Sequence, residues 1–171
     1  MRAKARILGH PIHQMLIVFP LGLLGASLAF DLIYLASRSA QFAVVSYWLI
    51  AAGIVTGLLA AVFGLIDWLA IPPRTRAKRI GRLHALGNVV VLGLFAADWL
   101  LRRSDPSLPT GTDVVLSAVA VLLALVTGWL GGELVDRLGV GVEEGAHLNA
   151  PSSLSGRPAT EEALAGAGHN R

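Results

Sequence analysis

The sequence predicts an all-α integral membrane protein in which four helices cross the bilayer as one bundle. Hydrophobic residues make up 54% of the 171-residue chain, whereas Asp, Glu, Lys and Arg together make up 15%. The mean hydropathy of +0.65 is far above that of soluble proteins. Four apolar runs approach or exceed the roughly 20 helical residues that cross a hydrocarbon core. The lipid bilayer is therefore the expected surroundings of most of the chain.

The four runs are expected to form helices joined by short connections. The third run is the shortest and is expected to take its first turn from residues 81–84, and the second is long enough to tilt. Pro20 falls inside the first run and lacks the N–H that would donate to the carbonyl of Leu16, so a bend is expected there. The runs cover residues 14–36, 42–70, 85–101 and 114–135.

Basic residues on alternate connections predict the orientation of the bundle. They are gathered in the N-terminal segment and in the connection between the second and third runs, and positively charged connections stay in the cytoplasm. Both termini are therefore predicted to be cytoplasmic, in the bacterial inner membrane. The net charge of +3 is assigned to contact with lipid and not with nucleic acid. The basic residues are Arg2, Lys4, Arg6, Arg74, Arg76, Lys78, Arg79 and Arg82.

Composition divides the chain into residues 1–142, the four-helix bundle, and residues 143–171, a tail rich in Gly, Ala, Ser and Pro that is predicted to be disordered. Small residues at helical spacing are expected to face neighbouring helices, because close backbone approach drives helix association in lipid. They include Gly22, Gly53, Gly57, Gly64, Gly87, Gly128 and Gly132. The chain has no cysteine, so a metal would have to be held by His, Asp or Glu.

Polar residues from all four runs are expected at one depth near the cytoplasmic side. Ionisable groups inside the apolar region are costly unless they are paired, so they tend to face the bundle interior and mark functional sites. The simpler alternative is that they lie at the lipid headgroups and pair with Arg79 or Arg82. The layer consists of His10 and His13 at the start of the first helix, Asp67 near the end of the second, His84 at the start of the third with Asn88 one turn deeper, and Glu133 near the end of the fourth.

Spacing places members of this layer on common helix faces. His10 and His13 are three residues apart, and His84 and Asn88 are four apart, so each pair shares one face. Glu133 follows two glycines that leave room for a neighbouring helix or a flat ligand. Near the opposite interface, Asp31 and Asp98 are weaker candidates and are expected to cap the bundle or to pair with Arg102 or Arg103.

These residues lie in short motifs that resemble, in order and in every helix, a bacterial membrane family filed as domain of unknown function 2231. The resemblance covers residues 7–142. It implies a four-helix membrane protein of unestablished activity. The motifs are His10-Pro11-Ile12-His13, Phe19-Pro20-Leu21-Gly22 with Asp31, Gly64-Leu65-Ile66-Asp67-Trp68, His84-Ala85-Leu86-Gly87-Asn88, Gly128-Trp129-Leu130-Gly131-Gly132-Glu133-Leu134-Val135 and Gly139-Val140-Gly141-Val142.

In some members the resembling module is joined to a Rieske iron–sulfur or cytochrome-like domain, which implies redox work. In a chain without cysteine that work would need a cofactor in the bundle or a separate redox protein partner. The first hypothesis is b-type haem with axial ligands His84 and either His10 or His13, near Asn88 and Glu133, with Gly87 and Gly132 making room for the ring.

Two further hypotheses stay open at the level of sequence. A divalent metal would use His10, His13, Asp67, His84 and Glu133, and a quinone headgroup would occupy the same layer. A non-catalytic scaffold would anchor a partner protein through the basic connection. No phosphate loop, nucleotide fingerprint or nucleophile–base pair is recognisable, which favours an electron-transfer or binding module over a stand-alone enzyme.

Overall fold

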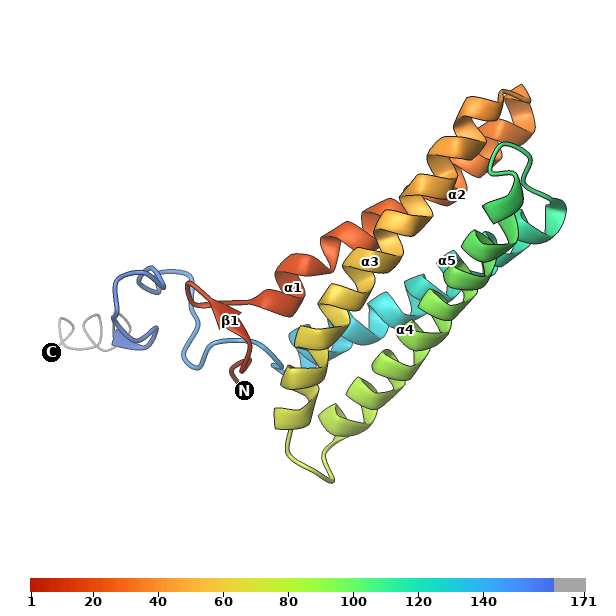
Figure 1. The fold of residues 1–171 in the computed structure, drawn as a ribbon. Coiled ribbons are helices and arrows are strands. Elements are labelled where there is room, and N and C mark those ends of the chain that lie inside the picture. The colour runs from red at the N-terminus through yellow and green to blue at the C-terminus, as the bar shows by residue number, and fades with distance from the viewer. Residues whose placement is uncertain (162–171) are drawn as a thin grey trace, which may run out of the picture.

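The computed structural model describes residues 1–161, and its helices form an antiparallel bundle (Figure 1). Four helical segments are long and apolar enough to cross a membrane, with mean hydropathies of 1.6 to 2.5. The predicted all-α membrane fold is confirmed. Within the predicted tail, residues 162–171 lie outside the described residues. The helices are α1 (Ile12–Leu16), α2 (Val18–Ser37), α3 (Ala40–Ala70), α4 (Arg76–Leu101) and α5 (Gly111–Gly132), followed by a π-helical turn, Glu133–Arg137.

Three of the four predicted spans match these helices to within a few residues. The first span is interrupted at Ile17, between α1 and α2. This break lies one turn before Pro20, whose missing N–H leaves the carbonyl of Leu16 without its helical donor.

The third span was predicted to begin near residue 81, and this was wrong: α4 begins at Arg76, and most of the basic connection is helical. Thr75 caps this helix by accepting from the backbone N–H of Lys78 at 3.1 Å. The first turns after Thr75 consist largely of Arg, Lys and Ala, which are strong helix formers. Charge marked these residues as a connection, although their helix propensity is high.

The helices associate as two antiparallel pairs, α2 with α3 and α4 with α5, which pack more closely within each pair than across the pairs. The central core is small and apolar, as expected of a bundle whose outer surface faces lipid. Large apolar side chains point outward, including Val55 at 58% exposure and Leu122 at 64%. The buried core residues are Leu24, Ile50, Val91, Phe95 and Ala120.

Glycines form several of the closest helix contacts. A Cβ added to Gly87 would lie 2.5 Å from Thr127 Cγ2, and one added to Gly57 would lie 2.8 Å from Leu92 Cδ2. Gly53 and Gly64 are equally crowded, so these four predicted contacts are confirmed. The predictions for Gly22, Gly128 and Gly132 were wrong, because nothing lies within 4 Å of a Cβ at those positions.

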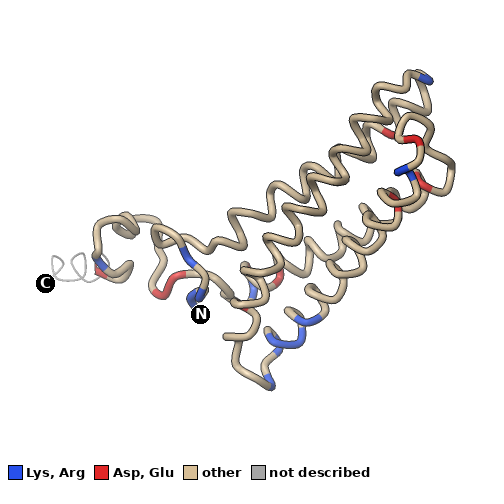
Figure 2. Tube along the Cα trace, in the orientation of Figure 1, with Lys and Arg blue, Asp and Glu red and all other residues tan. Residues whose placement is uncertain are grey.

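The two ends of the bundle differ in charge. The N-terminus, the α3–α4 connection and the chain beyond α5 all lie at one end (Figure 1), and Lys and Arg gather there (Figure 2). We call this the basic end. A short antiparallel hairpin, β1 (Arg6–Ile7) and β2 (His10–Pro11), precedes α1 at this end. Its turn residues Leu8 and Gly9 both have positive φ, 49° and 88°.

Candidate histidine site at the basic end

Two histidines meet across the two helix pairs at the basic end. His13 lies on α1, at the start of the first span, and His84 lies in the third turn of α4. Their ring centroids are 6.3 Å apart and their planes are nearly perpendicular, at 89°. Each helix pair thus contributes one imidazole to a common centre, which we call the histidine pair.

Backbone carbonyls fix the tautomer of both rings. His13 Nδ1 lies 2.8 Å from the carbonyl oxygen of Ala60 on α3, and His84 Nδ1 lies 2.8 Å from that of Thr127 on α5. A carbonyl oxygen only accepts, so each Nδ1 must carry the hydrogen. In the neutral ring the lone pair is then on Nε2. Metal-ligating histidines are oriented in the same way.

Asn88 reinforces the orientation of His84. Its Nδ2 lies 3.2 Å from His84 Nε2 and 2.9 Å from the His84 carbonyl oxygen. The His84 carbonyl oxygen only accepts, so it sets the amide with its NH₂ group toward His84, and Asn88 Oδ1 then faces Thr127 Oγ1 at 3.1 Å. Nε2 of His84 accordingly accepts a hydrogen bond, as the Nδ1–H tautomer requires.

Glycines pack directly against both rings. A Cβ at Gly64 would lie 2.8 Å from His13 Cε1, and a Cβ at Gly131 would lie 3.2 Å from His84 Cε1. Gly132, which the sequence analysis expected to make room for a haem ring, has nothing within 4 Å of a Cβ. The glycine of α5 that lies against His84 is Gly131, one residue earlier, because the helical register of α5 turns it toward that ring.

The remaining members of the predicted layer have other partners. Asp67 Oδ1 accepts from the backbone N–H groups of Lys4 at 2.6 Å and Ala5 at 3.0 Å, and so holds the N-terminal segment against α3. Glu133 pairs with Arg76 at 2.6 Å. His10 is exposed on β2.

The predicted convergence of His10, His13, Asp67, His84 and Glu133 was therefore wrong. Across residues 1–161, no group of three or more His, Asp or Glu side chains is placed to hold a metal ion. The physical reason is local. The carboxylate of Asp67 accepts hydrogen bonds from backbone N–H groups of the N-terminal segment. Because α4 begins at Arg76, that arginine is placed where it pairs with Glu133. Of the predicted layer, the structure joins His13, His84 and Asn88.

A second polar cluster lies at the opposite end of the bundle, around Arg102. Its guanidinium makes two hydrogen bonds to Asp31, at 2.6 and 2.8 Å, and two to Asp98, at 2.7 and 3.0 Å. The fifth N–H donates to Ser46 Oγ at 3.3 Å. Ser117 Oγ donates to Asp98 Oδ2 at 2.6 Å. All five guanidinium hydrogens are thus matched by acceptors.

This cluster is deeply buried and joins four helices. Asp31 and Asp98 are 0% exposed and Arg102 is 2% exposed. Of the alternatives that the sequence left open for the two aspartates, the structure shows pairing with Arg102. The sequence analysis missed Ser46 on α3 and Ser117 on α5, whose hydroxyl groups connect these two helices to the cluster. Isolated serines in otherwise apolar spans were the available signal, because a hydroxyl in lipid needs a partner.

Comparison with known proteins adds a family but no characterised relative. A family model described as "Predicted membrane protein (DUF2231)" matches residues 9–144, a range that contains both polar clusters. No curated protein and no solved structure matches the chain.

Proposed function

Because the chain belongs to the DUF2231 family of predicted membrane proteins, we propose that it is a redox-associated module of the bacterial inner membrane that binds a cofactor at His13 and His84. The basic end faces the cytoplasm in this proposal, since positively charged connections are retained on that side. The observation that carries it is the orientation of the two imidazoles: both Nδ1 hydrogens are given to backbone carbonyls.

The favoured cofactor is b-type haem, which His13 and His84, one from each helix pair, would hold. Their ring centroids lie 6.3 Å apart, close enough for both imidazoles to serve one bound group. Of the two partners of His84 that the sequence left open, His13 is favoured over His10, because His10 is exposed outside the bundle. Bound haem iron would supply one-electron chemistry.

This chain's own residues would have two tasks at such a site. Ala60 and Thr127 hold the ring tautomers through their carbonyl oxygens. Gly64 and Gly131 let the imidazoles pack directly against α3 and α5, because a Cβ at either position would lie within 3.2 Å of a ring atom. His13 and His84 lie on opposite sides of the boundary between the α2–α3 and α4–α5 pairs, where the helices pack less closely than within each pair.

The other ligands fit the histidine pair less well. A quinone headgroup needs N–H donors for its carbonyl oxygens, but both Nδ1 hydrogens are already donated within the protein. A divalent metal would find two imidazoles but no carboxylate beside them, because Asp67 and Glu133 bind elsewhere.

The test is optical. Protein purified in detergent from haem-replete cells is expected to show a Soret band and α-band that shift on reduction. His13→Ala and His84→Ala are each expected to lose the bis-imidazole spectrum, whereas His10→Ala, the matched control on β2, keeps it. A colourless wild-type protein that also fails to take up added haem would refute the proposal.

A further inference from the structure

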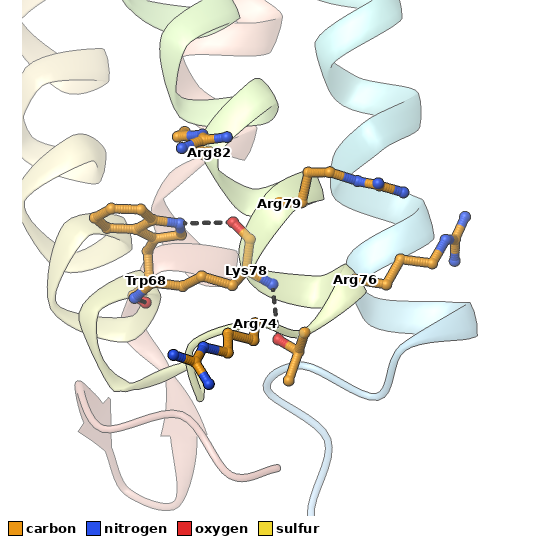
Figure 3. Close-up of a pocket in the computed structure, with 7 residues that line it drawn as sticks. Trp68, Arg74, Arg76, Lys78, Arg79 and Arg82 are labelled. Atoms are coloured by element: carbon orange, nitrogen blue, oxygen red, sulfur yellow. Dashed lines mark hydrogen bonds between the residues drawn. The ribbon is translucent and has the colours of Figure 1, made fainter.

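A hollow lined by basic side chains lies where α3 ends and α4 begins (Figure 3). It is open to the outside and has a volume of about 530 Å³. The histidine pair is not part of it, so it needs a separate explanation. Its lining residues are Trp68, Arg74, Thr75, Arg76, Lys78, Arg79 and Arg82.

Two of these cations already have partners in the protein. Lys78 Nζ donates to the carbonyl oxygens of Trp68 at 2.7 Å and Leu69 at 3.3 Å, and it lies 4.0 Å from the centroid of a Trp68 ring. It therefore covers the negative end of α3. Arg76 is paired with Glu133 at 2.6 Å.

The other arginines carry charge that nothing in residues 1–161 neutralises. Arg74, Arg79 and Arg82 are exposed, and none forms an ion pair within that range. In Figure 3, Arg74 and Arg82 lie below and above the Trp68 indole, whereas Arg76 and Arg79 extend to the other side of α4. The two unpaired arginines near the indole therefore make the part of the hollow best suited to an anion.

The connection holds Arg74 in an unusual conformation. Its φ is +63°, in the left-handed region that non-glycine residues rarely adopt. Two prolines, Pro72 and Pro73, precede it and restrict the turn. Strain of this kind costs about 1–3 kcal/mol and is concentrated at binding sites. A fixed turn thus directs this arginine at the hollow.

Exposed leucines lie close in sequence to Trp68 on α3 and to Arg82 on α4. Leu65 and Leu69 on α3 are 55% and 62% exposed, and Leu83 and Leu86 on α4 are 50% and 58% exposed. The Trp68 indole donates its N–H to the carbonyl oxygen of Lys78 at 3.2 Å, so a polar and an apolar edge meet at this ring. Tryptophan occupies this position at membrane interfaces.

We propose that this hollow binds the phosphate headgroup of an anionic phospholipid, with the unpaired Arg74 and Arg82, on either side of Trp68, as the cations that attract it. Guanidinium groups match the geometry of phosphate oxygens, which favours phosphate over other anions. The exposed leucines offer a path for acyl chains, which favours a lipid over a soluble phosphate. A general attraction of positive charge to the membrane would not require a hollow or the strained turn.

The experiment compares lipid retention by native mass spectrometry of the purified full chain in detergent, with phosphatidylglycerol, phosphatidylcholine and inorganic phosphate as separate probes. Wild-type protein is expected to retain phosphatidylglycerol well above phosphatidylcholine. The double variant Arg74→Gly/Arg82→Gln is expected to weaken phosphatidylglycerol binding roughly 25-fold, since each basic residue near the surface contributes about fivefold. Glycine suits the positive φ, so this variant should fold.

The matched control is Arg2→Gln/Arg6→Gln, which removes the same charge at the basic end but outside the hollow, where both arginines pair with Glu143. It is expected to bind lipid as the wild type does. Equal losses in both double variants would overturn the proposal in favour of unspecific charge. Displacement of the lipid by millimolar inorganic phosphate would overturn the assignment to lipid. The assignment would also be overturned if the purified protein retained a protein partner, and no lipid, in a manner that depends on Arg74 and Arg82. If the double variant does not fold, Arg82→Gln alone must still weaken binding several-fold.

Discussion

The Arg102 cluster and the histidine pair are both polar groups in an apolar bundle, yet they differ in how completely their hydrogen bonds are met. Around Arg102, all five guanidinium hydrogens have acceptors and the three charged side chains are at most 2% exposed. In the histidine pair, both Nδ1 atoms are matched, but His13 Nε2 has no hydrogen bond among the described residues. Both rings are only half-buried.

The difference separates a structural role from a binding role. A buried network with every donor matched rigidifies the helices that meet there. It offers no free ligand atom. The His13 ring, whose tautomer is fixed and whose Nε2 makes no hydrogen bond among the described residues, is prepared for an external ligand, whereas Nε2 of His84 would have to exchange its hydrogen bond from Asn88 for that ligand. We therefore expect stability to depend on the Arg102 cluster and cofactor binding on the histidine pair.

The largest effect is expected at Arg102. Arg102→Met would leave Asp31 and Asp98 buried without their cation, which costs about 3–5 kcal/mol of stability. The measurement is the free energy of unfolding in mixed detergent micelles titrated with dodecyl sulfate. Arg103→Met is the control, because Arg103 is exposed. Equal stability of the two variants would show that the cluster is not structural.

A smaller loss is expected from one of the serines in the cluster. Ser117→Ala removes the hydroxyl that donates to Asp98 Oδ2 at 2.6 Å, and a hydrogen bond to a charged group is worth about 1.5–3 kcal/mol. Ser27→Ala is the comparison, since Ser27 Oγ donates only to the Leu24 carbonyl oxygen within its own helix. Unfolding titrations that rank Ser27→Ala as the more damaging change would argue against a network across helices.

Packing next to the histidine pair can be tested with two glycines of one helix. Gly87→Ala would push a methyl group to 2.5 Å from Thr127 Cγ2, and overpacking of this kind costs about 1–3 kcal/mol. Thr127 also holds Asn88, so haem affinity should fall as well. Gly93→Ala on the same helix meets nothing within 4 Å and should change neither stability nor affinity. Identical behaviour of the two alanine variants would contradict the close α4–α5 contact.

The smallest effect on stability is expected at His84. His84→Ala removes two hydrogen bonds of a half-buried ring, to Thr127 and Asn88, for about 1–2 kcal/mol in total. Its effect on cofactor binding should instead be complete. A destabilisation as large as that of Arg102→Met, measured by the same unfolding titration, would mean that the histidine pair is itself a structural network.

The fold was largely predictable from sequence, because its determinants are local. Apolar length gave the spans, and Pro20 marked the interruption of the first span near Ile17. The start of α4 was missed because charge indicated a connection, whereas Thr75 and the helix formers after it extend the helix to Arg76. Whether a basic segment is loop or helix depends on its cap and not on its charge.

The site was predictable only in part, because it depends on tertiary contacts. Spacing placed His84 and Asn88 on one face, and the structure brings them together. The sequence could not show that Asp67 accepts hydrogen bonds from the backbone N–H groups of Lys4 and Ala5, since those donors belong to a distant segment. Nor could it choose between Gly131 and Gly132, because a single-residue difference in helical register decides which one faces His84.

The most direct test of this division of roles is a haem titration of detergent-solubilised apoprotein, followed at the Soret band, for the wild type, His13→Ala/His84→Ala and Ser117→Ala. We predict that wild-type and Ser117→Ala proteins both develop the spectrum of bis-imidazole haem with similar affinity, although Ser117→Ala is less stable, and that the double histidine variant does not. A double histidine variant that still develops this spectrum, or a Ser117→Ala protein that loses it while folded, would contradict the account.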